Sequence, residues 1–246
     1  MTSWNKKEYY IYLSLTIMSD KMSDKNRKED SMDSMKALLD SITVNTQSSI
    51  RFEHAGKVYY VDPFELTKPV NDADYIFVTH DHGDHYDESS IANVIKPGTL
   101  LVTPESTAKK AAVLAPENPR LAVQPEQWYQ ECGAEFETVP AYNIEKNFHP
   151  KDNGWVGYLF YLGDLRLYVA GDTDATDDAE QVSADIVMVP IGGYYTMNYA
   201  EAAELVNEIA PEAVIPTHYG TIVGDKEDGE KFAKLIDKGT TVLFRL

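Results

Sequence analysis

The chain has 246 residues, a formal net charge of −18 at pH 7 and 43% hydrophobic residues. This length allows one large domain or two small ones with a substantial core, and the negative charge disfavours nucleic acid and anionic membrane as partners. The single cysteine, Cys132, excludes an internal disulfide and a zinc site built from several thiolates, so we expect it to be a small core residue.

The beginning of the chain differs from the rest in composition. Residues 1–32 are largely polar and charged without a clear period, which predicts a flexible leader, or even a non-native translation start, before a domain at 33–246. The apolar stretch Tyr9 to Met18 is too short for a membrane helix. No small-residue cleavage site follows Lys6 and Lys7, so we expect no signal peptide and a cytoplasmic protein.

Strand and helix patterns then alternate along the chain. After a short helix at 35–39, two strands around Ala55–Gly56 predict a hairpin, and the apolar run at 75–79 predicts a buried strand. Thr103 and Pro104 are typical of a helix start, so a helix is expected from there to Leu114. Further strands are expected at 136–140, 156–162, 165–170, 185–190, 213–216 and 240–245. Helices are expected after Asn198, which forms a capping box with Glu201, and near 227–238. This order indicates a layered α/β domain with mixed sheets.

The densest polar group follows the strand at 75–79. Three of the six histidines lie between His80 and His85, with two aspartates among them. Imidazole nitrogen and carboxylate oxygen are ligands for zinc, manganese and iron(II). In extended backbone His80, His82 and Asp84 share one side and His85 breaks the parity. The window could therefore serve two neighbouring metals, with Gly83 permitting a turn between the ligand pairs.

Two more predicted strands end in the same kind of polar loop. The strand at 165–170 leads to Asp172, and the strand at 213–216 leads to His218. Ligands in α/β proteins commonly gather where strands end. Three separate strand ends of this kind indicate a shared metal site more strongly than any one of them.

These motifs resemble those of the metallo-β-lactamase superfamily. The stretch His80 to His85 is similar to its HxHxDH signature, Gly171-Asp172-Thr173 to its bridging-aspartate loop, and Pro216 to Gly220 to the segment of its last histidine. The resemblance covers about residues 45–246 and is closest to compact, single-domain metal-dependent hydrolases. It implies a four-layer αββα sandwich with a dinuclear metal site at the edge of the sheets.

The resemblance also implies a set of metal ligands. It gives His80, His82, Asp84, His85, Asp172 and His218, together with one more histidine for the first metal. The family usually places that histidine after a Pro-Ala pair, whereas here Pro140-Ala141 is followed by Tyr142 and Asn143. We expect His149 to take this place, with Asn143 or a two-histidine first site as the alternatives. His54 is left out because it lies in the hairpin turn before the motif.

Several other polar residues have less specific roles. Asp62 is expected either to orient a ligand histidine or to cap a strand end. Asp174 is expected to be a solvated loop carboxylate. Tyr194, Tyr195 and Tyr219 are loop tyrosines that could line the pocket.

A dinuclear site of this kind predicts hydrolysis. Two divalent ions, most simply Zn²⁺ with Mn²⁺ or Fe²⁺ as alternatives, can lower the pKa of a bound water to about 7. With two aspartates and a bridging hydroxide the pocket would carry about +1, favouring substrates with a carboxylate or phosphate oxygen. We expect a metal-dependent hydrolase acting on a small-molecule ester, lactone, amide or phosphodiester. Asp84 and Asp81 are the candidate catalytic residues, with Asp81 orienting the water or moving a proton.

Two other classes of protein compete with this interpretation. A non-catalytic metal-binding protein could retain the fold, although the nearly complete ligand set argues against it. A di-iron redox enzyme would usually need an extra carboxylate and a flavin partner domain, of which the sequence gives no sign. We expect a small-molecule substrate and neither nucleic acid nor membrane as a partner, while a homo-oligomer is allowed.

Overall fold

The structure, a computed structural model, describes residues 31–246. The predicted leader therefore lies outside the described residues, apart from its last two positions. Residues 31–41 are helical, a longer helix than the one expected at 35–39. Residues up to Asp40 and those from Ser41 onward form separate units, and the following description concerns the second. No helix within residues 31–246 is long and apolar enough to cross a membrane.

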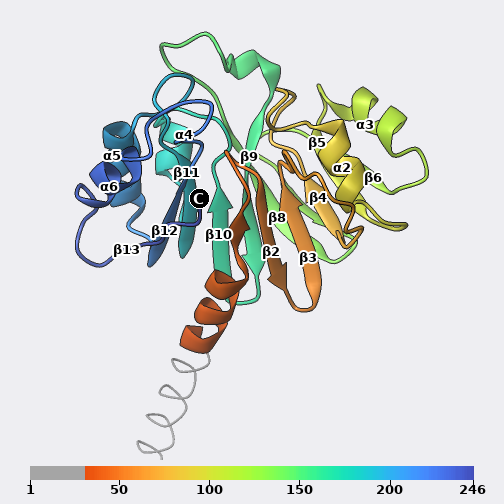
Figure 1. The fold of residues 1–246 in the computed structure, drawn as a ribbon, viewed down its shortest axis with the longest axis horizontal. Coiled ribbons are helices and arrows are strands. Elements are labelled where there is room, and N and C mark those ends of the chain that lie inside the picture. Colours follow the sequence, from red (N-terminus) through yellow and green to blue (C-terminus); the bar gives the residue numbers. More distant parts are fainter. Residues whose placement is uncertain (1–30) are drawn as a thin grey trace, which may run out of the picture. The chain divides into compact units, whose positions relative to one another are not determined.

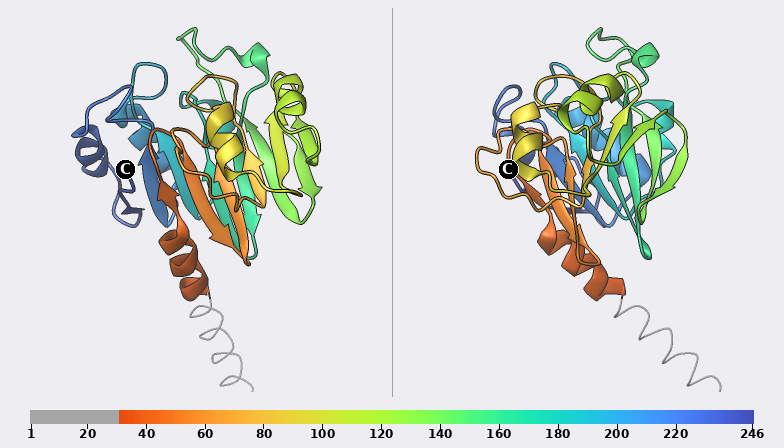
Figure 2. Two further views of the ribbon diagram at one scale, coloured as in Figure 1. Left: turned by 45° about the vertical axis from the view of Figure 1, so that its right-hand side comes forward. Right: turned by 90° about the vertical axis from the view of Figure 1, so that its right-hand side faces the viewer.

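The first of two mixed β-sheets is formed by the first six strands (Figures 1 and 2). The strands follow chain order across the sheet: β1 (Thr43–Val44), β2 (Ile50–His54), β3 (Lys57–Val61), β4 (Tyr75–Phe77), β5 (Leu100–Pro104) and β6 (Arg120–Val123). Pairing is antiparallel from β1 to β3 and parallel from β3 to β6. The predicted hairpin is thus confirmed as β2 and β3.

The second sheet contains the remaining seven strands. They are β7 (Trp128–Glu131), β8 (Ala134–Pro140), β9 (Val156–Leu162), β10 (Leu165–Val169), β11 (Ile186–Pro190), β12 (Ala213–Thr217) and β13 (Thr241–Val242). They lie side by side in chain order, antiparallel from β7 to β10 and parallel from β10 to β13. Each sheet therefore begins as a meander and ends in parallel strands.

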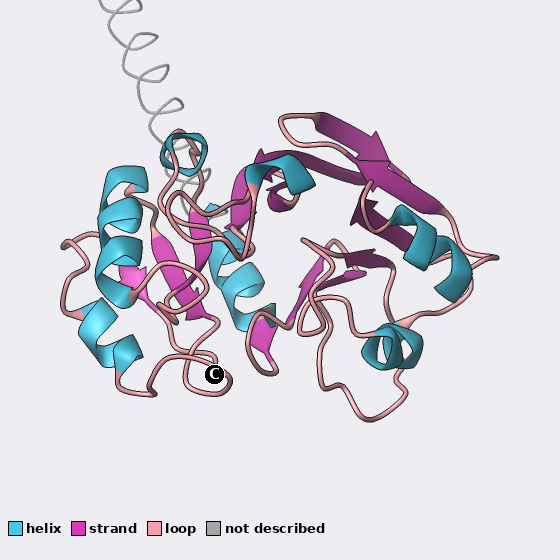
Figure 3. Ribbon diagram, turned by 90° about the horizontal axis from the view of Figure 1, so that it is seen from above, coloured by secondary structure: helices cyan, strands magenta, loops and turns pink. Residues whose placement is uncertain are grey.

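Helices cover the outer face of each sheet (Figure 3). The first sheet carries α2 (Glu88–Val94) and α3 (Ala108–Leu114); the second carries α4 (Asp177–Glu180), α5 (Tyr199–Ile209) and α6 (Asp228–Ala233). Ile91 of α2 packs in one buried cluster with Ile76 of β4. Leu205 of α5 packs in another with Val187 of β11. The 3-10 turn η1 (Lys151–Asn153) lies in a loop. The arrangement is the predicted four-layer αββα sandwich.

Aromatic side chains fill the space between the two sheets. The ring of Phe77 on β4 lies 5.0 Å from Phe136 and 4.8 Å from Phe160, both at nearly right angles. Phe52 of β2 contacts Phe160 at 5.5 Å. Edge-to-face pairs of this kind contribute about 0.5–1.5 kcal/mol beyond their burial. Since Phe77 points inward and Ile76 outward, β4 is buried on both faces, which explains its unbroken apolar run.

The region around Thr103 and Pro104 differs from the prediction. These residues end β5, where they pair with Ala122 and Val123 of β6, and they do not open a helix. The helix α3 begins only after Thr107 and ends at Leu114 as expected. The Glu105 N–H beyond Pro104 still donates to the Val123 carbonyl of β6, so a proline is tolerated at this strand end. The same Thr-Pro pattern is typical of a helix start, which made the signal misleading here.

Two other local predictions have opposite outcomes. Cys132 is exposed, in the turn between β7 and β8 with a φ of 51°, so the prediction of a core position was wrong. Asn198 accepts hydrogen bonds from the Ala200 and Glu201 N–H groups, and Glu201 accepts one from the Asn198 N–H. The predicted capping box of α5 is therefore confirmed.

Candidate metal centre

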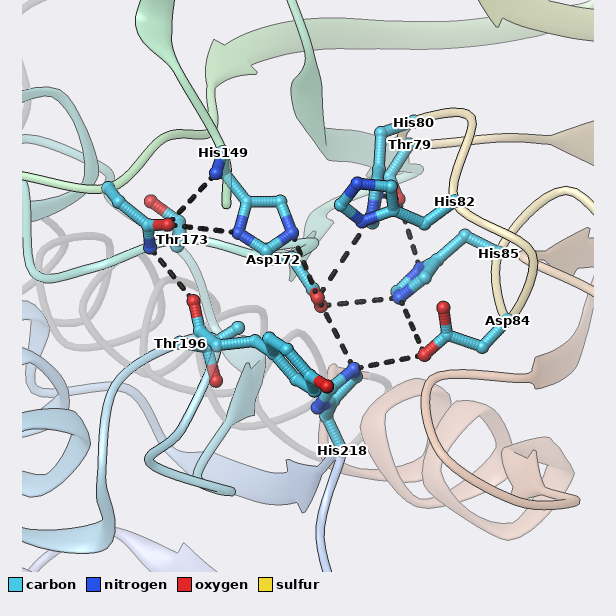
Figure 4. Close-up of polar contacts among 12 residues, drawn as sticks. Thr79, His80, His82, Asp84, His85, His149, Asp172, Thr173, Thr196 and His218 are labelled. Atoms are coloured by element: carbon cyan, nitrogen blue, oxygen red, sulfur yellow. Dashed lines mark hydrogen bonds and ion pairs between the residues drawn. The ribbon is translucent and has the colours of Figure 1, made fainter. Parts of the chain in front are cut away.

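Side chains from the loops after β4, β8, β10 and β12 point toward one another in one cluster (Figure 4). Among residues 31–246, three overlapping groups of side chains bring their ligand atoms within 4.8 Å of one another. The groups are His80, His82 and His149; His80, His85 and Asp172; and Asp84, His85 and His218. All seven residues predicted as ligands belong to them.

The first group combines the start of the His80–His85 segment with the loop after β8. The Nε2 atom of His80 lies 3.1 Å from Nδ1 of His82. Two ring nitrogens this close need a proton or a cation between them, because two lone pairs would repel. His149 is buried, and its Nε2 atom has no hydrogen-bond partner among the described residues.

Asp172 lies at the middle of the cluster. Its Oδ2 atom is 3.3 Å from Nε2 of His149 and 3.2 Å from Nε2 of His218, while Oδ1 is 3.4 Å from Nε2 of His85. The preceding Gly171 has a φ of +67°, and a Cβ there would lie 3.2 Å from the side chain of Thr79. The turn that presents Asp172 therefore requires glycine on both counts.

The third group joins the end of the His80–His85 segment to His218. The Asp84 Oδ2 atom lies 3.7 Å from Nε2 of His85 and 3.4 Å from Nε2 of His218. The backbone is not extended here, because the N–H groups of His85 and Tyr86 both donate to the His82 carbonyl. Gly83 in this turn is not among the glycines with positive φ. The expected turn between the two ligand pairs is present at Gly83, and it does not depend on the left-handed backbone conformation that favours glycine.

Acceptors behind two of the rings fix how they point. The Nδ1 atom of His85 lies 2.7 Å from Oδ2 of buried Asp62, which also accepts from the Thr79 hydroxyl at 2.7 Å. The Thr79 oxygen in turn lies 3.0 Å from Nδ1 of His80. These contacts hold the Nδ1 side of each ring and direct the Nε2 atoms of His85 and His80 into the cluster. Asp62 thus lies where a ring-orienting residue is expected.

Asn143 lies behind His149 in the same way. Its Oδ1 atom accepts from the backbone N–H of His149 at 2.9 Å and lies 3.1 Å from the ring Nδ1. Its amide group donates to Asp174 at 3.1 Å. Asp174 also accepts from Lys146 at 2.8 Å and is buried, so the expectation of a solvated carboxylate was wrong. The segment folds back around Asp174 and brings His149 to the cluster.

Burial and close charges shift the ionisation of these groups. Burial lowers the pKa of His80 well below its usual value and also lowers that of His82. Burial acts to raise the pKa of Asp172, but His218 and His85 hold it well below the usual range. Against the same opposing effect of burial, the hydrogen bond with His218 helps lower the pKa of Asp84 to about 2. Burial acts to lower the pKa of His85, but the charges of Asp172 and Asp62 hold it well above its usual value. The cluster combines carboxylates with imidazole nitrogens, the donor set that divalent cations bind.

Two residues near the centre had no signal in the sequence. Gln47 is fully buried, and its Nε2 atom lies 3.5 Å from both Asp84 Oδ2 and His218 Nε2. Trp155 packs its ring 4.9 Å from His80 and 4.8 Å from His82. A glutamine in a loop and a tryptophan before a strand are both common, and only the folded chain brings them here.

A pocket of about 450 Å³ opens beside the cluster. Its lining combines four of the predicted ligands with glycine and large side chains: Phe64, His82, Gly83, Asp84, Phe148, Asp172, Tyr195, His218 and Ile222. Of the three predicted tyrosines only Tyr195 lines it; Tyr194 is exposed and Tyr219 buried. Asp81 does not line the pocket and forms an ion pair with Lys110 at 3.0 Å.

The donor atoms of the centre fit divalent cations. The Nε2 atoms of His85 and His149 and Oδ1 of Asp172 are buried and have no hydrogen-bond partner in the described part of the chain. Unpaired buried polar atoms of this kind are costly, and a bound ion would satisfy them together. Imidazole nitrogen with carboxylate oxygen suits zinc, manganese and iron.

Comparisons with known proteins agree with this fold and identify the family of the chain. A family profile described as beta-lactamase superfamily domain matches residues 41–218, and the chain belongs to this family. A UPF0173 metal-dependent hydrolase from Thermococcus onnurineus is 30% identical over 211 residues, covering 79% of this chain and 92% of the relative. The predicted membership of the metallo-β-lactamase superfamily is thus confirmed.

Solved structures give the same picture of the fold. The crystal structure of a candidate metal-dependent hydrolase from Parabacteroides distasonis has a TM-score of 0.70 and 28% identity, covering 83% of this chain and 91% of that one. A metallo hydrolase from Ignicoccus hospitalis has a TM-score of 0.64 at 18% identity, covering 83% and 94%. The second likeness concerns the fold alone.

Proposed function

We propose that the protein is a metal-dependent hydrolase that binds two divalent cations. Zinc is the first expectation, with Mn²⁺ or Fe²⁺ as alternatives. The observation that carries the proposal is the position of Asp172, whose two oxygens lie 3.2–3.4 Å from the Nε2 atoms of His149, His218 and His85. A carboxylate shared between two sets of imidazole donors is suited to bridge two ions. The names of the relatives, metal-dependent hydrolases, support the same reaction class.

The ligands divide between the two ions as the three groups suggest. His80, His82 and His149 would hold the first ion, Asp84, His85 and His218 the second, and Asp172 both. When bound, the ions supply Lewis acidity that activates a water and stabilises negative charge on the substrate oxygen. Asp62 and Asn143 keep the lone pairs of His85 and His149 directed at the ions through their hydrogen bonds to Nδ1.

Asp84 is the carboxylate best placed to move a proton. Its side chain is 22% exposed and lines the pocket, whereas the Asp172 side chain is only 3% exposed. Its lowered pKa keeps it ionised at neutral pH, ready to accept a hydrogen bond from the attacking water. Asp81 would act only indirectly, because Lys110 holds its carboxylate.

The substrate in this proposal is a small molecule and the location cytoplasmic. The strongly negative net charge supports the first part, since it opposes nucleic acid and anionic membrane. The alternative is a metal-binding protein without catalysis. It predicts a metal-loaded protein that is inert on esters, lactones, amides and phosphodiesters.

Metal analysis and a substrate panel on the same purified protein test the proposal. The full chain should contain about two equivalents of metal and hydrolyse at least one substrate of the panel. His82→Ala and Asp172→Ala should lose both metal and activity, while His54→Ala, a histidine at the end of β2, should keep both. Full metal content in the His82 and Asp172 variants would disprove the ligand assignment.

A further inference from the structure

The pocket beside the metal centre has one wall of large apolar and aromatic side chains. Phe64, Phe148, Tyr195 and Ile222 come from four different loops and line the same space. Phe148 is 39% exposed and Ile222 is 54% exposed. Single exposed apolar residues are ordinary, but several that converge on one pocket usually mark a binding surface.

Contacts among the aromatic residues hold this wall in place. The Phe148 ring lies 4.8 Å from Tyr195 at an angle of 87° and 5.5 Å from Tyr194. The Tyr195 carbonyl accepts a hydrogen bond from the Asn143 amide at 2.9 Å. Since Asn143 also holds His149, the wall and the metal centre are positioned by the same side chain.

Among residues 31–246, no lysine or arginine lines the pocket. Lys110 and Lys146, on segments that contact the centre, are already paired with Asp81 at 3.0 Å and Asp174 at 2.8 Å. Sites for phosphate esters often add arginine, lysine or helix N–H donors to the positive charge that metal ions supply to the phosphate oxygens. Within this pocket an anionic substrate would meet no such side chain.

We propose that the substrate is an uncharged carboxylic ester, linear or cyclic, whose acyl group carries an apolar chain seated against Phe148 and Ile222. This inference rests on the proposed hydrolase function and narrows it, because it favours carboxylic esters over phosphodiesters and replaces the expected preference for anionic substrates. In the reaction the water oxygen forms a bond to the acyl carbon and the acyl carbon–oxygen bond breaks. The leaving oxygen takes one proton from water, and the acid formed releases the other.

Binding measurements test the wall without depending on turnover. The probes are alkyl hydroxamates from acetohydroxamate to octanohydroxamate, which share one metal-binding head and differ only in the apolar tail. They are titrated calorimetrically into the full chain reconstituted with Zn²⁺. We expect the dissociation constant to fall with each added methylene, by up to about fourfold where the methylene is fully buried. The para-nitrophenyl esters of the same acids should show a parallel rise in kcat/KM.

Three single substitutions separate the wall from the rest of the protein. Phe148→Ala and Ile222→Ala should flatten the dependence of the hydroxamate dissociation constant on chain length. Val113→Ala is the matched control, because Val113 is an equally apolar side chain, 83% exposed on α3 and not part of the pocket. For Val113→Ala, the hydroxamate dissociation constant should depend on chain length as it does for the unmodified protein. Phe148→Ala could also disturb the neighbouring ligand His149. Ile222→Ala removes a side chain that is not adjacent to a ligand in the sequence, so it tests the wall independently.

The outcomes distinguish this inference from the proposed function. An affinity that does not change along the hydroxamate series overturns the apolar-substrate inference, as does tighter binding of methylphosphonate than of octanohydroxamate. Faster hydrolysis of bis-para-nitrophenyl phosphate than of every ester would do the same while leaving the hydrolase proposal intact. The proposed function itself is decided by the metal content and by the His82 and Asp172 variants.

Discussion

The side chain of Asn143 is joined to one residue, His149, at two points. Its Oδ1 atom accepts from the His149 backbone N–H at 2.9 Å and lies 3.1 Å from the ring Nδ1. With Nδ1 held from behind, the opposite ring nitrogen lies 3.3 Å from Asp172 at the centre of the cluster. Asn143 therefore fixes both the backbone and the ring of the histidine that completes the first group.

Removing this support should weaken metal binding at the first group without abolishing it. Asn143→Ala should lower metal affinity there by about 10–100-fold, the usual effect of losing a partner behind a ligand. His149→Ala should lose about one equivalent of metal outright. Competition with a chelator measures the metal affinity and the metal content of both variants. Equal loss of metal in the two variants would indicate that Asn143 itself binds the ion, and unchanged affinity in Asn143→Ala would contradict its supporting role.

Asp62 should matter for stability as well as for metal binding. Its carboxylate accepts from the Thr79 N–H at 2.8 Å and from the Thr79 hydroxyl, and it contacts His85 Nδ1, all fully buried. Asp62→Ala would leave these donors without partners, so we expect the free energy of unfolding to fall by about 3–5 kcal/mol. Urea unfolding in the presence of chelator isolates this effect from metal binding. Asp164→Ala, exposed in the turn between β9 and β10, should change little.

Gln47 should tune the second group of ligands. Its carbonyl accepts from the His218 N–H at 3.0 Å, its Oε1 atom accepts from the Thr221 hydroxyl at 2.6 Å, and its amide lies beside Asp84. Gln47→Met keeps the length of the side chain but removes the polar contacts. We expect metal affinity at the second group to fall by about 10-fold, as measured by chelator competition. Gln130→Met on exposed β7 is the control; an equal effect of both would rule out a specific role.

Stability should depend on pH through Asp74, away from the metal centre. Burial acts to raise the pKa of this carboxyl, but the Val58 N–H, Lys57 and Lys96 lower it below its usual value. A lowered folded-state pKa stabilises the fold at pH values above the unfolded pKa of about 3.9. That contribution is lost as the pH falls through the folded-state pKa.

The Asp74→Asn variant tests this dependence. The unmodified protein should be more stable than Asp74→Asn at pH 6, and the difference should shrink as the pH is lowered below about 4. Chemical unfolding over this pH range measures it, with Asp164→Asn as the exposed control. A difference between the two proteins that is independent of pH would indicate that the carboxylate charge contributes nothing.

Local patterns predicted the strands and helices whose signals are complete within a few residues. The apolar run of β4, the strands β9 and β10, and the cap at Asn198 were all visible in this way. Strands β6 and β7 were missed because much of their surface is exposed and their apolar pattern is weak. Pro104 misled because the same residue suits a helix start and a strand end.

The residues of the metal centre also differ in whether a local sequence pattern predicted them. The seven predicted ligands stand in compact motifs, and the fold brings their donor atoms together. The supporting residues have no comparable sequence motif. The role of Asn143, six residues before His149, follows only from its hydrogen bond to that ring. Gln47 lies far in the sequence from Asp84 and His218, the two residues that it contacts. Asp174 was taken for a surface residue because nothing local shows that Lys146 and Asn143 enclose it.

The origin of the ligands in two separate sheets has a consequence for the protein's lifetime. Residues 80–85 leave β4 of the first sheet, while His149, Asp172 and His218 follow β8, β10 and β12 of the second. Ions held by both sets would act as cross-links between the sheets. At a free metal concentration 100 times the dissociation constant, one such ion adds about 2.7 kcal/mol to the stability of the folded chain. Metal scarcity would then have two effects on this protein. It would remove the hydrolytic activity, and it would raise the fraction of unfolded chain that is open to proteolysis.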